Sequence, residues 1–486
     1  MISSTLIALG TLAAYLIILL LTARLTGKEK SNEAFFRGNK KSRWYLVAFG
    51  MIGASVSGVS FISVPGYVGH TQMTYLQMCI GFFFGYLIVA YVLLPIYYKK
   101  NLTSIYSYLQ DRFGSTSRKT GAIFFIISKI SGAAIRFYLV CIVLQQFLFG
   151  QLGIPYPATV VIILSMVWLY TRKAGIRTLV YTDSLQTLCF ICVIIAVLII
   201  IGRQMYPSLT DMTEAIASSS FGRVFIWDDW NDKQYFWKQF LSGIFIVVVM
   251  TGLDQDMMQK NLTCPDLQKA QKDMCTYGFF FIPVNLLLLA IGALLYIYAR
   301  QNSITIPESG DQLFPLLVQN GCFGPLVTVL FILGISAAAF SSIDSALTAL
   351  TTTFCIDILN IDKETSETHA VKKRKLVHLC IVVFFIILTI MFKWIGNNSV
   401  IDVIYIMASY TYGPLLGLFS FGIFTRYQIQ ERYTPFIAIA APLICYALSY
   451  LVPYYTHYQF GYELLMLNGA LTFFMLYLSR RPASQT

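Results

Sequence analysis

The sequence predicts an all-α integral membrane protein that crosses the bilayer about 13 times. Of its 486 residues, 57% are apolar and only 12% are charged, which is unlike a soluble globular protein. Apolar windows of about 20 residues, the length that spans the hydrocarbon core as a helix, recur along the whole chain. The bilayer interior leaves no water for an open sheet edge, so these windows are expected to be helices.

The first apolar window lacks a basic start and an Ala-x-Ala cleavage site, so we interpret it as a retained helix and not as a signal peptide. The predicted spans are 3–22, 45–69, 74–98, 119–149, 155–171, 179–202, 238–259, 274–299, 325–355, 376–393, 400–425, 435–453 and 460–478.

Most basic residues fall on alternate loops and on the C-terminal tail. Because basic residues are retained on the cytoplasmic side, we expect the N-terminus outside and the C-terminus inside a bacterial-type cell membrane. The net charge of +12 then reflects the topology of the chain and does not indicate a nucleic-acid partner. Some of the basic side chains could also bind anionic lipid headgroups. The basic set includes Arg24 to Arg43, Lys99, Lys100, Arg172 to Arg177, Lys260 to Lys272, Lys372 to Lys375, Arg480 and Arg481.

The chain is expected to be one transporter domain over residues 1–486 and no enzyme, since it has no polar stretch long enough for a soluble domain. It also lacks a Gly-rich Walker segment, so uphill transport must use an ion gradient or the membrane potential. Without the first and the last two spans, ten remain, which divide into five and five. An odd number per half inverts the second half, so inverted repeats are predicted over about 45–202 and 238–425. The ten cysteines are scattered singly and are interpreted as free thiols.

The second span contains four serines, four glycines and a proline between Gly50 and Gly66. In inverted-repeat carriers such small residues mark a break where free carbonyls hold an ion. Close helix packing through small residues is the alternative.

Two acids lie inside predicted spans. Asp344 shares a helical face with Ser341, Ser345 and Thr348, and should meet a cation, a proton or a basic partner, unless it only hydrogen-bonds a neighbouring helix. Asp183 begins the sixth span and could instead lie at the cytoplasmic interface. If the two acids are close, they require a bridging cation or a proton.

Arg136 lies deep in the fourth span, where a guanidinium should face a cavity or a carboxylate. It is the best candidate for binding an anionic solute, because its two-pronged donor set matches a carboxylate. A structural ion pair with Asp183 or Asp344 is the alternative.

These segments resemble the sodium/solute symporter family, whose members carry sugars, proline, sialic acid, monocarboxylates, vitamins and iodide with sodium. The most specific pieces are Thr251 to Leu262, similar to the family's DQxxxQR segment, and Ala337 to Ser345. Supporting pieces are Tyr181 to Gln186 and Tyr412 to Gly417. The usual Arg is replaced by Lys260, which matters little if that residue faces the cytoplasm.

The resemblance implies the LeuT-type inverted-repeat fold with one extra N-terminal and two extra C-terminal helices. It implies a main Na⁺ site formed by the carbonyls of Gly53, Val56 and Ala338 and the hydroxyls of Ser341 and Ser342. A second Na⁺ site, found in some sialic acid carriers, would use Asp183, Ser341, Asp344 and Ser345.

By the same resemblance, the solute would contact Ser55, Ser57 and Ser60, with Gln77 and Arg136 nearby, and the inner gate would involve Met250 and Thr251. Sugar and sialic acid carriers have a polar ligand six residues before a tyrosine. Here that place is Gly132, and Arg136 lies one turn further on the same face.

We therefore expect a monomeric sodium symporter that imports a small acidic solute, such as a sialic acid or a monocarboxylate, by alternating access. A sodium:sugar or sodium:polyol symporter and a proton-coupled carrier are the alternatives. A transporter-like sensor is less expected, because the tail after Leu478 offers no signalling domain.

Overall fold

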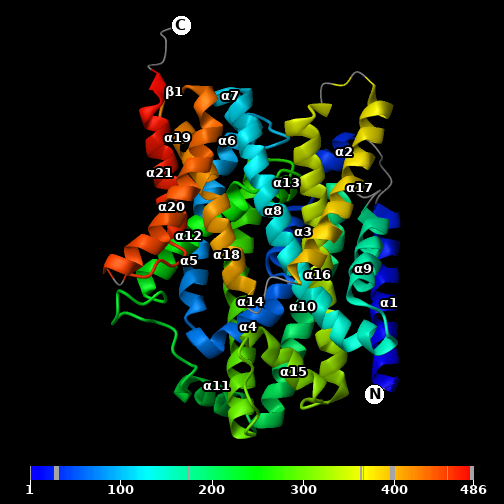
Figure 1. The fold of residues 1–486 in the computed structure, drawn as a ribbon. Coiled ribbons are helices and arrows are strands. Elements are labelled where there is room, and N and C mark those ends of the chain that lie inside the picture. The colour runs from blue at the N-terminus through cyan, green and yellow to red at the C-terminus, as the bar shows by residue number, and fades with distance from the viewer. Residues whose placement is uncertain are drawn as a thin grey trace.

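A computed structural model of the chain describes residues 2–26, 32–171, 175–361, 364, 366–393, 400–456 and 458–481, and shows a bundle of long helices (Figure 1). The α-helices are α1 (Ile2–Thr26), α2 (Asn32–Arg37), α3 (Trp44–Ser55), α4 (Gly58–Thr71), α5 (Tyr75–Ile88), α6 (Leu94–Lys99), α7 (Ser107–Arg112), α8 (Ser115–Leu144), α9 (Tyr156–Thr171), α10 (Ile176–Met205), α11 (Leu209–Ser218), α12 (Phe236–Val247), α13 (Gln255–Asn261), α14 (Leu267–Gln301), α15 (Leu313–Gln319), α16 (Gly324–Thr353), α17 (Glu367–Phe392), α18 (Val400–Thr411), α19 (Gly413–Phe424), α20 (Thr434–Thr456) and α21 (Leu464–Leu478).

Shorter elements connect or extend these helices. The 3₁₀ turns are Gly38–Lys40, Gly150–Leu152, Gly310–Gln312 and Glu431–Tyr433, and the π-helical turns are Val89–Leu93, Gln145–Phe149, Val248–Gly252 and Phe354–Ile358. Two short strands, β1 (Gln428–Ile429) and β2 (Arg480–Arg481), pair antiparallel and join the chain end to the segment before α20.

Each predicted span coincides with one of these helices or with a bent pair of them. Within the described residues, eight helices are long and apolar enough to cross a membrane, or up to eleven if each of three bent pairs is one span. Two shorter apolar helices, Tyr156–Leu169 and Leu464–Leu478, correspond to the fifth and last predicted spans. The predicted all-α membrane fold is therefore confirmed.

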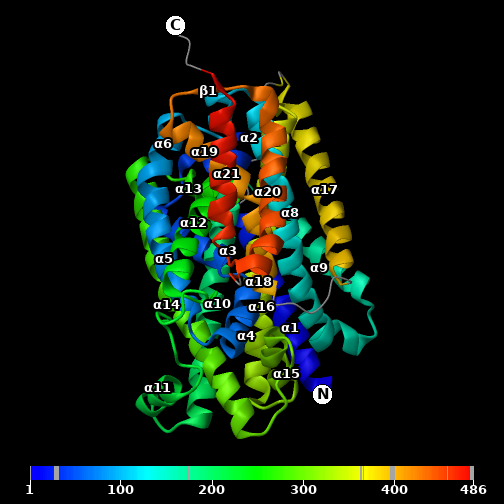
Figure 2. The same cartoon turned by 60° about the vertical axis from the view of Figure 1, so that its left-hand side comes forward.

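The chain begins and ends at opposite ends of the bundle, as an odd number of spans requires. In Figure 1, α1 begins at the lower end, whereas α21 leads up to β2 at the upper end. Figure 2 shows the same arrangement after rotation, with α11 and α15 at the lower end and α6 and β1 at the upper end. Among the predicted basic loop positions, residues 27–31 and 172–174 lie outside the described residues.

The second predicted span is interrupted at its serine-rich segment, as predicted. α3 ends at Ser55 and α4 begins at Gly58, with a bend of 56° between them. Val56 (φ −81°, ψ 78°) and Ser57 (φ −76°, ψ 174°) leave the helical region. A Cβ on Gly58 would lie 2.8 Å from a methyl carbon of Val140, so only glycine fits this close approach.

Two further spans are broken. The span that contains α12 and α13 bends by 69°, and the side chain of Asp254 caps α13 by accepting bonds from the backbone N–H groups of Asp256 and Met257. The span formed by α18 and α19 bends by 45°, where Pro414 starts a new helix after Tyr412. The first two breaks open the two predicted repeats, whose exact bounds stay a prediction.

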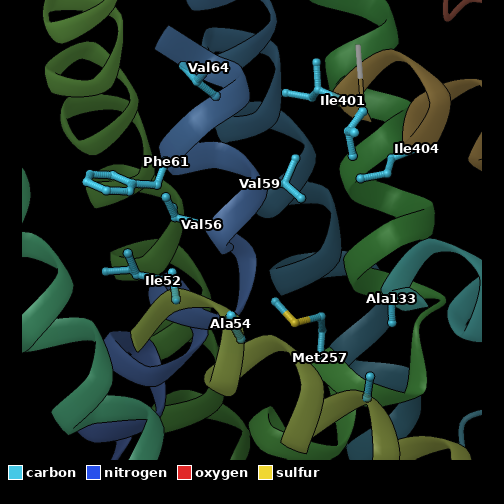
Figure 3. Packing of buried hydrophobic residues seen from close by; sticks show 14 of the residues in the cluster. Ile52, Ala54, Val56, Val59, Phe61, Val64, Ala133, Met257, Ile401 and Ile404 are labelled. Atoms are coloured by element: carbon cyan, nitrogen blue, oxygen red, sulfur yellow. The ribbon is translucent and has the colours of Figure 1, made fainter. Parts of the chain in front are cut away.

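α16 lies in the interior of the bundle and packs against α10, α8, α4 and α3. Figure 3 shows the apolar side chains around the first break, among them Val56, Val59 and Phe61. Phe61 is fully buried, and its ring lies 5.6 Å from that of Phe331 on α16. In lipid, such packing replaces the hydrophobic effect as the force that holds helices together, and it fixes the break against α16.

Candidate functional site

The first break lies directly against the serine pair of α16. The hydroxyl of Ser342 donates to the carbonyl of Ala54, 3.3 Å away, and to that of Ala338, 3.1 Å away. Gly53 precedes Ala54, and Val56 is the first residue after α3. The structure therefore places the hydroxyl of Ser342 against the end of α3, between the carbonyls of Ala54 and Ala338, of which Ala338 is a predicted Na⁺ ligand.

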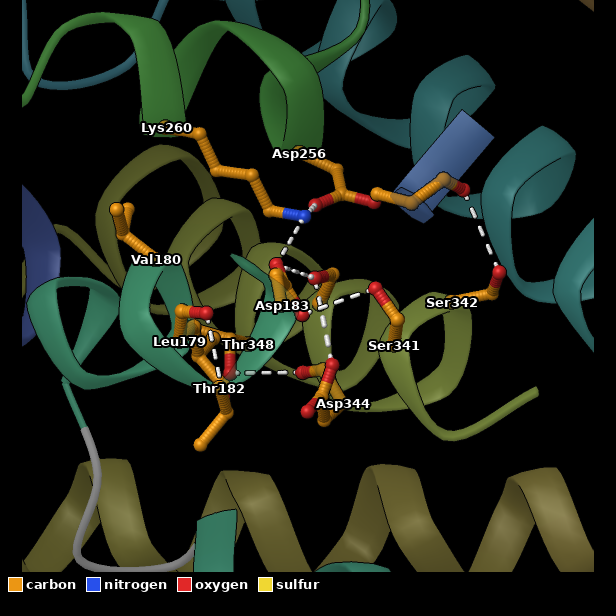
Figure 4. A network of polar contacts seen from close by, with 12 residues as sticks. Leu179, Val180, Thr182, Asp183, Asp256, Lys260, Ser341, Ser342, Asp344 and Thr348 are labelled. Carbon is orange, nitrogen blue, oxygen red and sulfur yellow. Dashed lines mark hydrogen bonds and ion pairs between the residues drawn. The ribbon is translucent and has the colours of Figure 1, made fainter. Parts of the chain in front are cut away.

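The neighbouring hydroxyl of Ser341 has a different partner. It donates to Asp183 Oδ1 on α10 at 3.0 Å, and Ser345 donates to the other carboxylate oxygen at 3.2 Å. Asp183 is fully buried inside the protein. Ser345 also donates to Asp344 at 3.4 Å, which places both predicted acids and both serines in one buried polar cluster (Figure 4).

The same cluster contains a cation that the sequence reasoning missed. Lys260 of α13 is 1% exposed, and its Nζ lies 2.7 Å from Asp183 Oδ2. Figure 4 shows its side chain extending from α13 towards α10, beside Asp256. The expectation that Lys260 belongs to a basic cytoplasmic loop is wrong, because α13 continues through this residue and directs it into the protein. Helical spacing from Asp256, which lies 4.0 Å away, was the available sequence signal.

A cavity of about 100 Å³ lies beside the first break, between α3, α8, α12, α14 and α18. It is the natural place for a solute, since it is concave and lined by both aromatic and polar groups. Of the residues predicted around the solute and the inner gate, the lining includes Ser55, Arg136, Met250 and Thr251; it also includes Gly132, where relatives have a polar ligand.

The other predicted solute contacts lie elsewhere. Ser57 and Ser60 are not part of the cavity lining. Gln77 is fully buried and bonds the outer loop, donating to the carbonyl of Gln234 at 2.8 Å and accepting from the N–H of Ile226 at 3.1 Å. In this conformation Gln77 therefore holds the loop before α12, with both ends of its amide engaged.

Two basic residues line the cavity, and they differ in their partners. Lys129 pairs with Asp254 at 3.1 Å and with Asp256 at 2.8 Å, so two carboxylates neutralise it. Tyr412 also donates to Asp254 at 2.7 Å. Arg136, which is half-buried, takes part in none of the ion pairs found among the described residues, so the alternative of a structural pair with Asp183 or Asp344 is not realised here.

Four tyrosines connect the lining of this cavity with that of a second cavity of about 460 Å³. Tyr405, which lines the first cavity, shares a hydrogen bond of 2.8 Å with Tyr75. Tyr67 and Tyr462 line the second cavity, share a bond of 3.1 Å, and both donate to Asp402. These residues come from α4, α5, α18 and the segment before α21, so the cluster connects four parts of the bundle.

The broken helices, the oxygen-rich contact at Ser342 and the cavity with its polar and aromatic lining are those of a polytopic membrane carrier. The family model of the sodium:solute symporter family matches residues 35–430, and the chain belongs to this family. The predicted sodium-coupled solute symport is thereby confirmed, with Na⁺ as the co-transported ion.

The individual relatives share low sequence identity with this chain, but they match it over most of its length. The chain is 24% identical over 432 residues to the sodium/sialic acid symporter SiaT of Proteus mirabilis (strain HI4320), covering 86% of this chain and 84% of that one. It is 25% identical to the mouse sodium-coupled monocarboxylate transporter 1, covering 82% and 65%. A solved structure of a Na⁺-coupled sialic acid symporter in a substrate-bound outward-open state superposes with a TM-score of 0.84 at 22% identity, covering 99% of both chains. This likeness confirms the predicted LeuT-type fold.

Proposed function

We propose that this chain imports a small organic acid together with Na⁺ by alternating access. The observation that carries the proposal is Arg136, whose guanidinium is the one cavity-lining charge without an ion-pair partner among the described residues. Lys129 cannot play the same part, because Asp254 and Asp256 already neutralise it. A carboxylate on the solute would supply the partner of Arg136 in a two-pronged geometry.

The relatives support the acidic class. The proteins named above carry sialic acid or monocarboxylates, and both kinds of solute contain a carboxylate. A neutral sugar or polyol would leave Arg136 with only hydroxyl partners. The remaining groups at the cavity, including Ser55 and the rings of Tyr86 and Tyr277, would bind the rest of the solute.

The main Na⁺ is proposed to bind between the carbonyls of Gly53, Val56 and Ala338 and the hydroxyls of Ser341 and Ser342. The contact of Ser342 with Ala54 supports this assignment, since it brings α16 against the end of α3. Na⁺ held there would fix the break in the conformation that completes the adjacent cavity. By linkage, Na⁺ and solute then raise each other's affinity by the same factor, commonly about 1–3 kcal/mol.

We also propose that the end of the bundle near β2 is cytoplasmic, in a bacterial-type cell membrane, and that the carrier acts as a monomer. The basic loops around α2, α6, α7 and β2 support this orientation. Labelling of a single cysteine placed in the C-terminal tail should require permeabilised cells. Labelling in intact cells would reverse the orientation.

The experiment is uptake into proteoliposomes of radiolabelled N-acetylneuraminic acid, lactate and glucose, with Na⁺ or choline outside at a fixed, equal pH. We expect uptake of an acid to be stimulated by Na⁺ and to stop in choline. Stimulation by an inward proton gradient in choline would instead identify a proton-coupled carrier. Na⁺-dependent uptake of glucose alone would contradict the acidic class. A thermal-shift screen of organic acids, with and without Na⁺, then identifies the solute.

A further inference from the structure

The buried ion pair between Lys260 and Asp183 lies where a second cation site was predicted. Asp183 receives the ammonium of Lys260 at 2.7 Å, the hydroxyl of Ser341 at 3.0 Å and the hydroxyl of Ser345 at 3.2 Å. All four side chains are at most 1% exposed. One ammonium in ion-pair contact and two hydroxyl donors, from α13 and α16, thus surround the carboxylate that a second Na⁺ would need as its ligand.

The charge balance at Asp183 disfavours a further cation. Lys260 gives Asp183 the directly contacting positive charge that a buried carboxylate requires, whereas Asp344 joins the cluster through the hydroxyl of Ser345. A Na⁺ bound to the same carboxylate would lie within a few ångströms of the ammonium, and the low dielectric of the interior would strengthen their repulsion. An ammonium group is a compact point charge with three donors, so it can substitute for a small monovalent cation.

Lys260 is also held from the other side. Asp256, one turn earlier on α13, lies 4.0 Å from its Nζ and is itself paired with Lys129 at 2.8 Å. Opposite charges therefore alternate from Lys129 at the cavity to Asp183 beside α16. This row restrains the lysine chain, so that its ammonium stays at Asp183.

We propose that the ammonium of Lys260 takes the place of a second Na⁺ at Asp183, so that the carrier binds one Na⁺ per cycle, at the main site. The proposal rests on the sodium-coupled import proposed above. The carrier then uses a cation that belongs to the chain to neutralise Asp183, and only the main-site cation crosses the membrane. The second Na⁺ expected at Asp183, Asp344 and Ser345 becomes the competing outcome of the test.

The test is equilibrium binding of ²²Na⁺ alone to purified protein in detergent, which requires no knowledge of the solute. We expect the wild type to bind one Na⁺ with a Hill coefficient near one. Lys260→Met removes the resident charge and frees Asp183, so it should bind two Na⁺. Lys260→Arg keeps the charge and should bind one.

Removal of the lysine leaves Asp183 without its counter-charge, and this variant could fail to fold. The double variant Asp183→Asn/Lys260→Met removes both charges, and we expect it to bind one Na⁺ as the wild type does. Two Na⁺ in the wild type, or a fall from the wild-type number in the double variant, would overturn the proposal. So would a folded Lys260→Met protein that still binds one. Failure of the proposed function has a different signature, namely ²²Na⁺ binding without Na⁺-stimulated uptake of any organic acid.

Discussion

Removal of one hydroxyl, in Ser342→Ala, tests the Na⁺ site at its central contact. The hydroxyl lies 3.3 Å from the Ala54 carbonyl and 3.1 Å from the Ala338 carbonyl, and its side chain is 8% exposed. Loss of a single buried polar partner costs about 1–3 kcal/mol, which corresponds to roughly a 5- to 150-fold weaker Na⁺ affinity. Because one neutral hydrogen bond contributes only about 1 kcal/mol to stability, the variant should still fold.

The assay measures Na⁺ dependence of uptake in proteoliposomes together with ²²Na⁺ binding, so that affinity and transport are separated. We expect Na⁺-stimulated uptake to fall at the Na⁺ concentration that just saturates the wild type, and to require roughly 5- to 150-fold more Na⁺ for the same rate. The matched control is Ser336→Ala on the same helix, because the Ser336 hydroxyl is fully buried and has no hydrogen-bond partner among the described residues. Normal Na⁺ dependence in Ser342→Ala, or an equal loss in Ser336→Ala, would refute the assignment.

Three further predictions concern the cavity and its surroundings. Arg136→Gln should lower uptake of an acidic solute by at least about tenfold. Arg136→Lys should have an intermediate rate, because lysine keeps the charge but lacks the two-pronged donor set. Unchanged uptake in Arg136→Gln would mean that the residue is structural. Gly53→Ala should lower stability in a thermal-unfolding assay by about 1–3 kcal/mol, since its Cβ would lie 2.0 Å from Thr187 Oγ1. Part of this loss should return in Gly53→Ala/Thr187→Ala; no loss in Gly53→Ala would contradict the packing. Tyr405→Phe removes the 2.8 Å hydrogen bond to Tyr75. A cysteine placed in the cavity that Arg136 lines should then react faster with an added thiol reagent. Unchanged reactivity would argue against a gate at these tyrosines.

The spans and the break in the second span could be predicted from the sequence because both signals are local, whereas the bends before α13 and α19 were not predicted. Apolar runs long enough for the bilayer must be helical, whatever surrounds them. The glycines and serines between Gly50 and Gly66 interrupt a helix by their own chemistry, and the structure bends the chain within that segment. Asp344 was recognisable as a buried charge for the same reason, since a charge within a span requires a partner.

The partners of these charges could not be predicted in the same way. Sequence spacing identifies neighbours on one helix, but it does not say which helix faces which. From the sequence, Arg136 could bind the solute or form a structural ion pair with Asp183 or Asp344. Only the tertiary structure shows that Arg136 lines the cavity, where α8 packs against α18. Gln77 was expected at the solute, yet the fold of the outer loop engages both ends of its amide.

The sequence by itself therefore determined that this is a helical membrane carrier with interrupted spans, and which residues are costly to bury. The tertiary structure decided how those residues are compensated. Lys260 is the clearest case, because the 69° bend before α13 turns a residue expected in a loop into the counter-charge of Asp183, 77 residues earlier in the chain. Compensation of a buried charge depends on distances of a few ångströms between helices, and bundle packing alone sets those distances.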